Sequence, residues 1–202
     1  MIKVGIIDYG GGNLRSLKRA VESLGHTVTL VDSPDSFEGL SHILYPGQGA
    51  YGDCLKKLRA RNLQEPLLDW IAADKPFFGI CVGYQLLFSD SEEAADEKGF
   101  QLIDGNIIKF RSNTLKIPHM GWNALEIADP SHKLWDGLSE TPYFYFVHSY
   151  YSEGVDPSYA AASCNYGEDF TACVIKGNLF ATQFHPEKSQ ENGLKLIENF
   201  LS

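Results

Sequence analysis

The sequence predicts an α/β fold in three layers, with a mostly parallel central sheet, helices on both faces, and additional antiparallel strands in the C-terminal half. Two observations carry this prediction. Strand-like and helix-like segments alternate up to residue 88, which is the pattern of βα units whose strands run parallel. From residue 100 onward, short apolar stretches follow one another with tight turns, which is typical of antiparallel strands.

The N-terminal elements are expected to form a βαβ unit. Residues 2–7 (IKVGII) are rich in β-branched residues and end at a glycine turn. Residues 13–24 carry leucine and valine at helical spacing, and Gly25 supplies a C-cap. Residues 27–31 (TVTLV) then form the second strand.

Later segments continue both patterns. The parallel half is expected to contain a strand at 42–45, helices near 52–61 and 65–73, a strand at 76–80 and a helix from Val82. The antiparallel half is expected to contain strands at 107–110, 122–127, 143–151, 159–164, 171–176 and 179–184. A closing helix at 190–201 places Leu194, Ile197 and Leu201 on one face.

Length and composition favour a single domain over residues 1–202. Hydrophobic residues make up 44% and charged residues 21%, which is an ordinary globular mixture. Because the net charge is −9 and Lys and Arg form no run, nucleic acid and anionic membrane surfaces are poor partner candidates. The acidic run at 89–98 is expected to be a solvated helix end and loop.

The compartment is predicted from apolar runs and cysteines. The first apolar run is too short for a signal peptide, and no apolar stretch approaches the ~20 residues that span a bilayer. The four cysteines are widely spaced and form no CxxC pair, which is typical of reduced thiols. We therefore expect a cytoplasmic protein.

The glycines at 10–12 suggest a dinucleotide-binding loop, since Asp32 lies where the ribose-binding acid would lie. The fingerprint fails because Arg15 occupies its third glycine position. No GxxxxGK[ST] phosphate-binding loop occurs either. A nucleotide is therefore not the expected ligand.

Residues 79–83 (GICVG) lie where an expected strand turns sharply into a helix. The flanking glycines remove side chains that would clash in such a turn, as in the nucleophile elbow of hydrolases. Cys81 would project from the C-terminal end of the sheet, where the dipole of the following helix favours a thiolate. We therefore predict that Cys81 is a nucleophile, whereas Cys164 and Cys173, in apolar alternating strands, are expected to be inert.

A cysteine nucleophile needs a base, and the base needs an orienting group. Of the six histidines, His26 and His42 lie at strand starts and His132 lies in a polar loop, so these are expected to be structural or exposed. His185 ends the stretch LFATQF, and a proline separates it from Glu187. Residues i and i+2 of an extended segment point the same way, so Glu187 can fix the tautomer of the imidazole. The pair lacks a convincing third metal ligand, and we expect no metal and no cofactor.

An oxyanion hole is the remaining requirement of this chemistry. Residues 46–49 (PGQG) end a strand with backbone N–H groups that could face a substrate carbonyl, although a plain βα turn is the better explanation when these residues are taken alone. The N–H of Val82, immediately after the nucleophile, would be the other donor.

Together, PGQG, GICVGYQ and HPE follow the order and separation of the motifs of class I glutamine amidotransferases, which the chain resembles over essentially its whole length. The stretches DYGGGNLRS (8–16), PHMGWN (118–123) and HPEKS (185–189) further resemble the glutaminase subunit of imidazole glycerol phosphate synthase, from histidine biosynthesis. The departures are mild. The family more often has Val, Leu and Met where this chain has Gln48, Val82 and Tyr84.

The resemblance implies a mechanism. Cys81 would attack the side-chain amide of L-glutamine, and His185, oriented by Glu187, would pass a proton to the departing ammonia. The N–H groups of Gln48 and Val82 would hold the oxyanion, and water would hydrolyse the resulting thioester to glutamate. The residues that match positions holding the glutamine head group are Gly49, Gln85, Ser149 and Tyr150.

A separate partner is expected because the recognisable segments leave no room for a domain that accepts ammonia. In the family that the chain resembles, the acceptor is a (β/α)₈-barrel cyclase, which makes imidazole glycerol phosphate and an aminoimidazole carboxamide ribotide as part of a heterodimer. The resemblance places Asn13, Trp122, Tyr145 and Lys188 on the side facing the cyclase. The structural alternatives are that Asn13 caps a helix and that Trp122 belongs to the core.

Three other functions remain open at this point. A γ-glutamyl hydrolase or another pathway's amidotransferase subunit would keep the triad but would give no reason for PHMGWN. Proteases and chaperones of the related cysteine-elbow superfamily commonly have His directly after the cysteine, where this chain has Val82. A catalytically inactive binding module is disfavoured because all three triad members are present.

Overall fold

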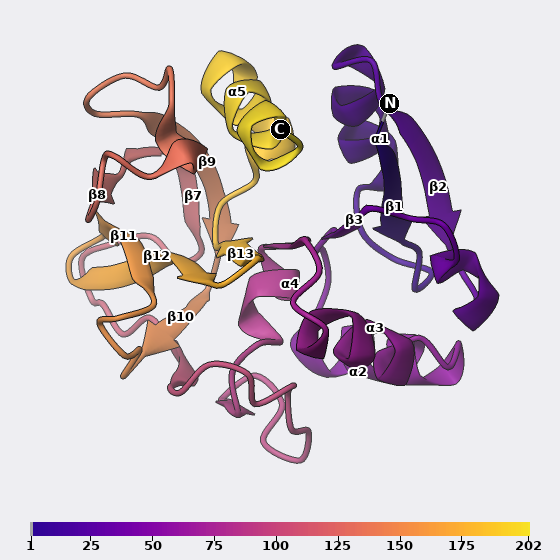
Figure 1. The fold of residues 1–202 in the computed structure, drawn as a ribbon. Coiled ribbons are helices and arrows are strands. Elements are labelled where there is room, and N and C mark those ends of the chain that lie inside the picture. The colour runs from indigo at the N-terminus through magenta and orange to yellow at the C-terminus, as the bar shows by residue number, and fades with distance from the viewer. Residues whose placement is uncertain (1) are drawn as a thin grey trace.

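The computed structural model describes residues 2–202 and contains one large mixed sheet with helices on both sides (Figure 1). The parallel half contributes the strands Lys3–Ile7 (β1), Thr27–Val31 (β2), His42–Tyr45 (β3) and Phe77–Ile80 (β4). The remaining strands are Asp90–Ser91 (β5), Asn106–Lys109 (β6), His119–Ala124 (β7), Glu126–Ile127 (β8), Tyr143–His148 (β9), Tyr150–Glu153 (β10), Ala160–Asn165 (β11), Asp169–Lys176 (β12) and Leu179–Thr182 (β13).

Strand pairing confirms the predicted parallel centre with antiparallel additions. The order is β2-β1-β3-β4-β13-β12-β10-β6-β5, and β11 pairs with β12 and β8 beside this path. From β2 to β13 the pairs are parallel, while β13, β12, β10 and β6 pair antiparallel with one another. The pairing of β4 with β13 brings the segment after residue 80 beside the segment after residue 182.

Helices cover both faces of the sheet, as the alternating pattern predicts (Figure 1). They span Leu14–Ser23 (α1), Tyr51–Ala60 (α2), Gln64–Ala72 (α3), Val82–Gln85 (α4) and Gln190–Phe200 (α5), and a 3₁₀ turn covers Pro186–Lys188. α1 and α5 contact each other on one side, and α2 and α4 contact each other on the other. Within the described residues, no helix has both the length and the apolar character needed to cross a membrane.

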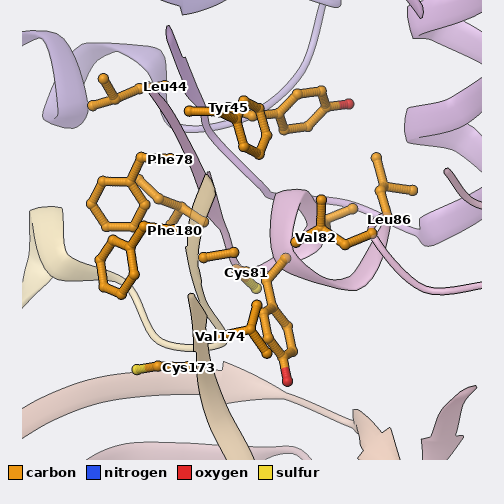
Figure 2. Close-up of a cluster of buried hydrophobic side chains, with 14 of the residues drawn as sticks. Leu44, Tyr45, Phe78, Cys81, Val82, Leu86, Cys173, Val174 and Phe180 are labelled. Atoms are coloured by element: carbon orange, nitrogen blue, oxygen red, sulfur yellow. The ribbon is translucent and has the colours of Figure 1, made fainter. Parts of the chain in front are cut away.

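The core lies on both faces of the parallel strands. β4 (FFGI) is buried along its whole length, because a parallel strand covered by helices has no solvent face. The Phe78 ring contacts Phe180 of β13 at 4.6 Å and Phe200 of α5 at 5.2 Å between centroids. Figure 2 shows this cluster reaching from Phe78 and Phe180 toward Cys81 at the end of β4.

The closing helix and the helix after Cys81 differ from the prediction. At the closing helix, Ile197 and Leu201 are buried as predicted, but Leu194 is 36% exposed and the remaining buried apolar residues are Leu196 and Phe200. α4 has a single turn, whereas a longer helix was expected. It stops because the carbonyls of residues 86 and 87 accept hydrogen bonds from the N–H groups of residues 100, 102 and 103 instead of continuing the helix.

Two predicted strands are each divided between sheets. The predicted strand 122–127 separates into β7 and β8, and the predicted strand 143–151 separates into β9 and β10 at Ser149. β7 and β9 form a two-stranded sheet of their own, called here the β7–β9 ribbon, with His119 opposite His148 and Trp122 opposite Tyr145. A change of pairing partner at Ser149 turns the chain toward the end of β4, where the candidate site lies.

Candidate active site

Cys81 occupies a strained turn between β4 and α4. Its backbone is left-handed, with φ 53° and ψ −101°, which non-glycine residues rarely adopt unless the surrounding structure enforces it. A Cβ on Gly79 would lie 2.6 Å from the Gly83 carbonyl oxygen, and a Cβ on Gly83 would lie 2.7 Å from the Tyr45 carbonyl oxygen. The predicted sharp turn is therefore present, and it requires glycine on both sides of the cysteine.

The short helix after Cys81 changes one part of the expected chemistry. Figure 2 shows Cys81 leading directly into Val82. α4 aligns only one turn of peptide dipoles, so the longer helix dipole expected behind Cys81 is not present. The N–H of Val82 still lies in the first turn, where backbone donors have no intrahelical acceptor. It therefore remains a candidate oxyanion donor.

His185 and Glu187 lie beyond the end of β13, which pairs with the strand that carries Cys81. His185 Nδ1 is 2.9 Å from Glu187 Oε1. A carboxylate only accepts, so Nδ1 carries the hydrogen and Nε2 is left to exchange a proton. The backbone N–H of His185 donates to the Tyr145 carbonyl at 2.9 Å, and its carbonyl accepts from the Ser189 hydroxyl at 2.6 Å. Both ends of the residue are therefore fixed.

The environment of His185 favours its charged form. Burial by itself would lower the pKa of the imidazole, but the neighbouring Cys81 sulfur and the Glu187 carboxylate outweigh burial and raise the pKa of His185 above its usual value. Within residues 2–202, His185 Nε2 is buried and has no hydrogen-bond partner. Nε2 is therefore the ring nitrogen that can exchange a proton, either with the neighbouring Cys81 sulfur or with a ligand in the adjoining cavity.

The other three cysteines have inert surroundings. Cys54, Cys164 and Cys173 are buried free thiols. Burial raises the pKa of Cys54, raises that of Cys164 to about 12, and raises that of Cys173 well above the ordinary thiol value. These thiols stay protonated at neutral pH, which agrees with the expectation for Cys164 and Cys173.

The PGQG loop packs directly on the elbow. A Cβ on Gly47 would lie 2.3 Å from the backbone nitrogen of Val82, so glycine is required for this close approach. The N–H of Gln48 donates to the Tyr9 hydroxyl at 3.4 Å, and the same hydroxyl donates to the Gln48 carbonyl at 3.2 Å. The N–H that the sequence assigned to the oxyanion hole is therefore engaged by a tyrosine that the sequence did not single out.

A cavity of about 370 Å³ joins these parts. Its walls come from the PGQG loop, the elbow, His185 and the β9–β10 junction. The four residues predicted to hold substrate all line it: Gly49, Gln85, Ser149 and Tyr150. The volume lies in the range of small-molecule sites, and it places Cys81 and His185 in one enclosure.

Three residues at or beside this cavity were missed by the sequence analysis. Glu93 lines the cavity and accepts from the Tyr51 N–H at 2.9 Å, although the acidic run that contains it was expected to be wholly solvated. His148 lines the cavity as well. Gln183 places Nε2 3.7 Å from the Cys81 sulfur. The period-two argument that linked His185 with Glu187 could have found Gln183, two residues earlier, but no local signal marks Glu93 or His148.

Tyr84, which departs from the residue common in the family it resembles, does not line the cavity. Its hydroxyl is 2.5 Å from the Ser152 hydroxyl and 2.7 Å from the Thr171 carbonyl, in the interior between α4 and the antiparallel strands. The larger polar side chain is thus accommodated by two hydrogen bonds. This departure leaves the wall of the candidate site unchanged.

The four residues assigned to a partner surface divide between two settings. Trp122, Tyr145 and Lys188 lie together, with the Trp122 and Tyr145 rings 6.2 Å apart and the Lys188 ammonium 5.9 Å from the Tyr145 ring. Trp122 is 45% exposed, so the alternative that it belongs to the core is wrong. Asn13 does cap α1, because its side-chain oxygen accepts from the Ser16 N–H at 3.4 Å.

Comparison with known proteins places this geometry in a family. Residues 5–202 match the family described as glutamine amidotransferase class-I. The imidazole glycerol phosphate synthase subunit HisH of Rhodopirellula baltica is 43% identical over 96% of this chain and 95% of its own, and that of Gloeothece citriformis is 45% identical over 100% and 96%. A crystal structure described as glutamine amidotransferase superimposes with a TM-score of 0.77 at 19% identity, covering 98% of this chain and 96% of that chain. The structure of PurLQS from Thermotoga maritima has a TM-score of 0.76 at 19% identity, covering 99% and 97%.

Proposed function

The chain belongs to the class I glutamine amidotransferases, and we propose that it hydrolyses L-glutamine and supplies the ammonia to the cyclase of imidazole glycerol phosphate synthase, in histidine biosynthesis. One observation carries the proposal. The cavity encloses a strained cysteine and an imidazole whose free nitrogen has no partner among residues 2–202. The relatives that share the whole length of the chain at 43–45% identity bear the name of this synthase subunit.

In the first half of the reaction, the Cys81 thiol has given its proton to His185 Nε2, and the thiolate sulfur attacks the side-chain carbonyl carbon of glutamine. The C=O electrons move to oxygen, and this oxyanion is held by the N–H groups of Val82 and Gln48. His185 then donates the proton on Nε2 to the amide nitrogen, and the C–N bond breaks to release ammonia. The product is a γ-glutamyl thioester on Cys81. Glu187 keeps the imidazole oriented and stabilises its charge through the 2.9 Å hydrogen bond.

In the second half, water enters the position that ammonia has left. His185 Nε2 removes a proton from the water as it attacks the thioester carbonyl carbon. The same two N–H groups hold the second oxyanion, and its collapse breaks the C–S bond. Glutamate leaves, and the sulfur and imidazole return to their starting state.

The cavity walls supply groups that suit the amino-acid head group. We infer that the Glu93 carboxylate holds the ammonium group of glutamine, because it is the acidic side chain on the cavity wall and has an oxygen fixed by the Tyr51 N–H. We propose that backbone groups at Gly49 and in the 149–150 segment, which line the same cavity, bind the carboxylate and the side-chain amide. Gln85 contributes through Oε1, because its Nε2 is already used within the protein.

The binding of the Gln48 N–H to Tyr9 supports a controllable oxyanion hole. In this arrangement one of the two proposed donors is engaged elsewhere. Gln48 has a glycine on each side, so rotation of the Gly47–Gln48 peptide would turn the Gln48 N–H toward the substrate carbonyl at modest backbone cost. A glutaminase without an acceptor wastes glutamine, so we propose that the loaded partner drives this rotation.

The outer face of the β7–β9 ribbon is the proposed docking surface for a (β/α)₈-barrel cyclase in a heterodimer. Met120 is 61% exposed and Tyr143 is 50% exposed beside Trp122 and Tyr145, so this face is apolar and aromatic, the composition found at the cores of protein interfaces. Lys188 adds a charge next to the aromatic rings. Asn13 belongs to the proposed surface even though it caps α1, since one side chain can serve both purposes.

The proposal treats residues 1–202 as a single cytoplasmic glutaminase domain. It is tested by measuring glutamate and imidazole glycerol phosphate formation by the chain alone and with the barrel cyclase. We expect the two products to form in equal amounts in the complex. If the rate of glutamine hydrolysis is the same with and without the cyclase, or if the chain hydrolyses γ-glutamyl peptides instead of glutamine, the chain would be reassigned to the γ-glutamyl hydrolases.

A further inference from the structure

A series of hydrogen bonds leads from the inner face of the β7–β9 ribbon toward the cavity. Asn123 Nδ2 is 3.3 Å from His119 Nε2. His119 Nδ1 is 2.9 Å from His148 Nε2, and His148 Nδ1 is 2.7 Å from the Tyr150 carbonyl oxygen. His119 and Asn123 are the polar residues of the PHMGWN motif, and the proposed partner surface does not account for them because Met120 and Trp122 point to the opposite face.

Both ends of this series impose the same direction on it. Asn123 Oδ1 accepts from the Ala124 N–H at 2.9 Å, so the atom facing His119 is the amide nitrogen, and His119 Nε2 must accept. At the other end a carbonyl oxygen can only accept, so His148 Nδ1 must carry a hydrogen. His119 Nδ1 then donates to His148 Nε2. Each histidine is therefore a neutral Nδ1–H tautomer.

The surroundings keep both histidines neutral. His119 is stacked between Phe146, at 4.7 Å, and Tyr166, at 4.0 Å between ring centroids. Burial lowers the pKa of His119 to about 4 and that of His148 to about 3. Protonation of His148 would place a hydrogen on Nε2, which would then face the hydrogen on His119 Nδ1, and the hydrogen bond between the two rings would be lost. The arrangement is consequently intact at neutral pH.

The series continues beyond Tyr150 to the nucleophile. The Tyr150 carbonyl also accepts from Gln85 Nε2 at 3.1 Å, and the second hydrogen of the same amide nitrogen goes to Gln183 Oε1 at 3.1 Å. With its oxygen committed to Gln85, the Gln183 amide must present nitrogen to Cys81, and Nε2 lies 3.7 Å from the sulfur. Gln183 is completely buried, so its amide has no contact with bulk solvent.

We propose that Gln183 is a catalytic residue that donates a hydrogen bond to the Cys81 sulfur, and that His119 and His148 are positioning residues that hold the Gln183 amide in the donating orientation through Tyr150 and Gln85. The proposal rests on the proposed glutaminase function and adds a side-chain donor to it. Hydrogen bonds to a charged acceptor are stronger than neutral ones, so the Gln183 contact favours the thiolate that attacks the amide. The two faces of PHMGWN then have separate tasks, partner contact outside and support of the nucleophile inside.

The tautomers give a direct test that does not depend on catalysis. Long-range ¹H–¹⁵N spectra of the isolated chain distinguish Nδ1–H from Nε2–H histidine, and single substitutions assign the signals of residues 119 and 148. We expect both to be Nδ1–H and to remain uncharged between pH 6 and 8. An Nε2–H tautomer at either residue, or protonation of either at pH 6, would overturn the proposal.

Alkylation of Cys81 by iodoacetamide tests the donor itself. Gln183→Leu removes the donor, and we expect about tenfold slower alkylation at pH 7, with the pH dependence moved to higher pH. His119→Leu should slow alkylation about threefold and should also move the pH dependence to higher pH. His119→Asn should alkylate at the wild-type rate, because its amide nitrogen occupies the place of Nδ1. Ser152→Ala is the matched control, because it removes a buried hydrogen bond to Tyr84 that is not part of the series ending at the sulfur. The alkylation rate of this variant should equal that of the wild type.

The outcomes separate this inference from the proposed function. If folded Gln183→Leu, verified by thermal melting, keeps the wild-type alkylation rate and pH dependence, the donor role is wrong. If His119→Asn behaves like His119→Leu, the positioning role of His119 is wrong. If the wild-type chain hydrolyses no glutamine with the cyclase while the alkylation series behaves as expected, the proposed function fails and the hydrogen-bonded arrangement stands.

Discussion

The elbow after β4 and the PGQG loop after β3 end neighbouring parallel strands, yet Cys81 and the Gln48 N–H are held in different ways. At the elbow, a Cβ on either flanking glycine would meet backbone atoms within 2.7 Å, and the Cys81 N–H donates to the Thr182 carbonyl at 2.7 Å. In the loop, Gly47 also packs closely on the elbow, but the Gln48 N–H beyond it is held by one hydrogen bond of 3.4 Å to the Tyr9 hydroxyl. The Gln48 carbonyl accepts from Tyr9 at 3.2 Å and from the Cys54 thiol at 3.7 Å. The proposed nucleophile is therefore fixed by close packing, whereas the N–H of the proposed oxyanion donor is held by a single hydrogen bond.

The difference suggests how one site can be both accurate and controllable. A strained cysteine must keep its orientation through every cycle, and only dense backbone contacts can enforce that. A hydrogen bond contributes about 1 kcal/mol net, so the Gln48 peptide can leave Tyr9 at small cost. One missing oxyanion donor costs roughly 10²–10³ in rate, which is large enough to act as a switch.

The largest effect is expected at the fixed side of the site. Cys81→Ala in the complex should reduce glutamine-dependent synthesis by at least about 10⁴-fold, because the covalent route is lost. Synthesis driven by added ammonium salt should persist, because the acceptor site is on the partner. Parallel assays with glutamine and with ammonium measure both activities. Loss of both, with the complex still assembled, would contradict this division between the chains.

The two other triad members should rank below the cysteine and differ from each other. His185→Ala removes the proton carrier, whereas Glu187→Gln only disturbs the orientation of an imidazole that backbone contacts still hold. We expect Glu187→Gln to retain roughly ten times or more of the activity of His185→Ala. Steady-state glutaminase rates of the two variants in the complex provide the measurement. The reverse order would show that Glu187 has a role beyond orientation.

Selective labelling compares Cys81 with the three buried thiols. A glutamine-like electrophile should label Cys81 at least about 100 times faster than the others. Since burial raises the pKa of Cys164 to about 12, only about 10⁻⁴ of that thiol is ionised at pH 8. Peptide mapping after partial labelling checks this, and comparable labelling of Cys54 or Cys173 would refute the assignment of Cys81 as the reactive thiol.

Binding of the loaded partner should act on the PGQG loop, where the Gln48 N–H is held by Tyr9. We expect low glutaminase activity for the isolated chain and at least a tenfold rise when the cyclase and its ligand are both present, because the Gln48 N–H then reaches the oxyanion. Stopped assays on the chain, the complex and the ligand-loaded complex give the comparison. Equal turnover in all three would mean that the loop is permanently set.

The smallest expected effect comes from Tyr9. Tyr9→Phe removes the acceptor of the Gln48 N–H and leaves the Gln48 carbonyl with the Cys54 thiol as its partner. Glutaminase activity of the isolated chain should therefore rise about three- to tenfold, and activation by the partner should shrink correspondingly. Tyr45→Phe is a matched control, because the Tyr45 ring stacks on Tyr9 at 5.3 Å and its buried hydroxyl has no partner among residues 2–202. Unchanged or lower activity in Tyr9→Phe would show that Tyr9 does not restrain the loop.

Much of the site could be predicted because its parts are local in the chain. The elbow needs only a cysteine between two glycines at the end of a strand, and the His185–Glu187 pair follows from the two-residue period of extended backbone. The PGQG loop was recognised in the same way, from the residues that follow a strand. Each of these features depends on backbone geometry that neighbouring residues dictate.

The sequence by itself therefore determined the fold class and the family resemblance, and it supplied the proposed nucleophile Cys81 and its proposed base His185. Only the tertiary structure decided that α4 has one turn, that Tyr9 holds Gln48, and that Glu93 reaches the cavity. It also joined His119 to His148 and Gln183 to Cys81, across separations of 29 and 102 residues. The physical reason is that a hydrogen bond between distant segments depends on strand order and register, which are set by packing of the whole chain and leave no mark in any single stretch of residues.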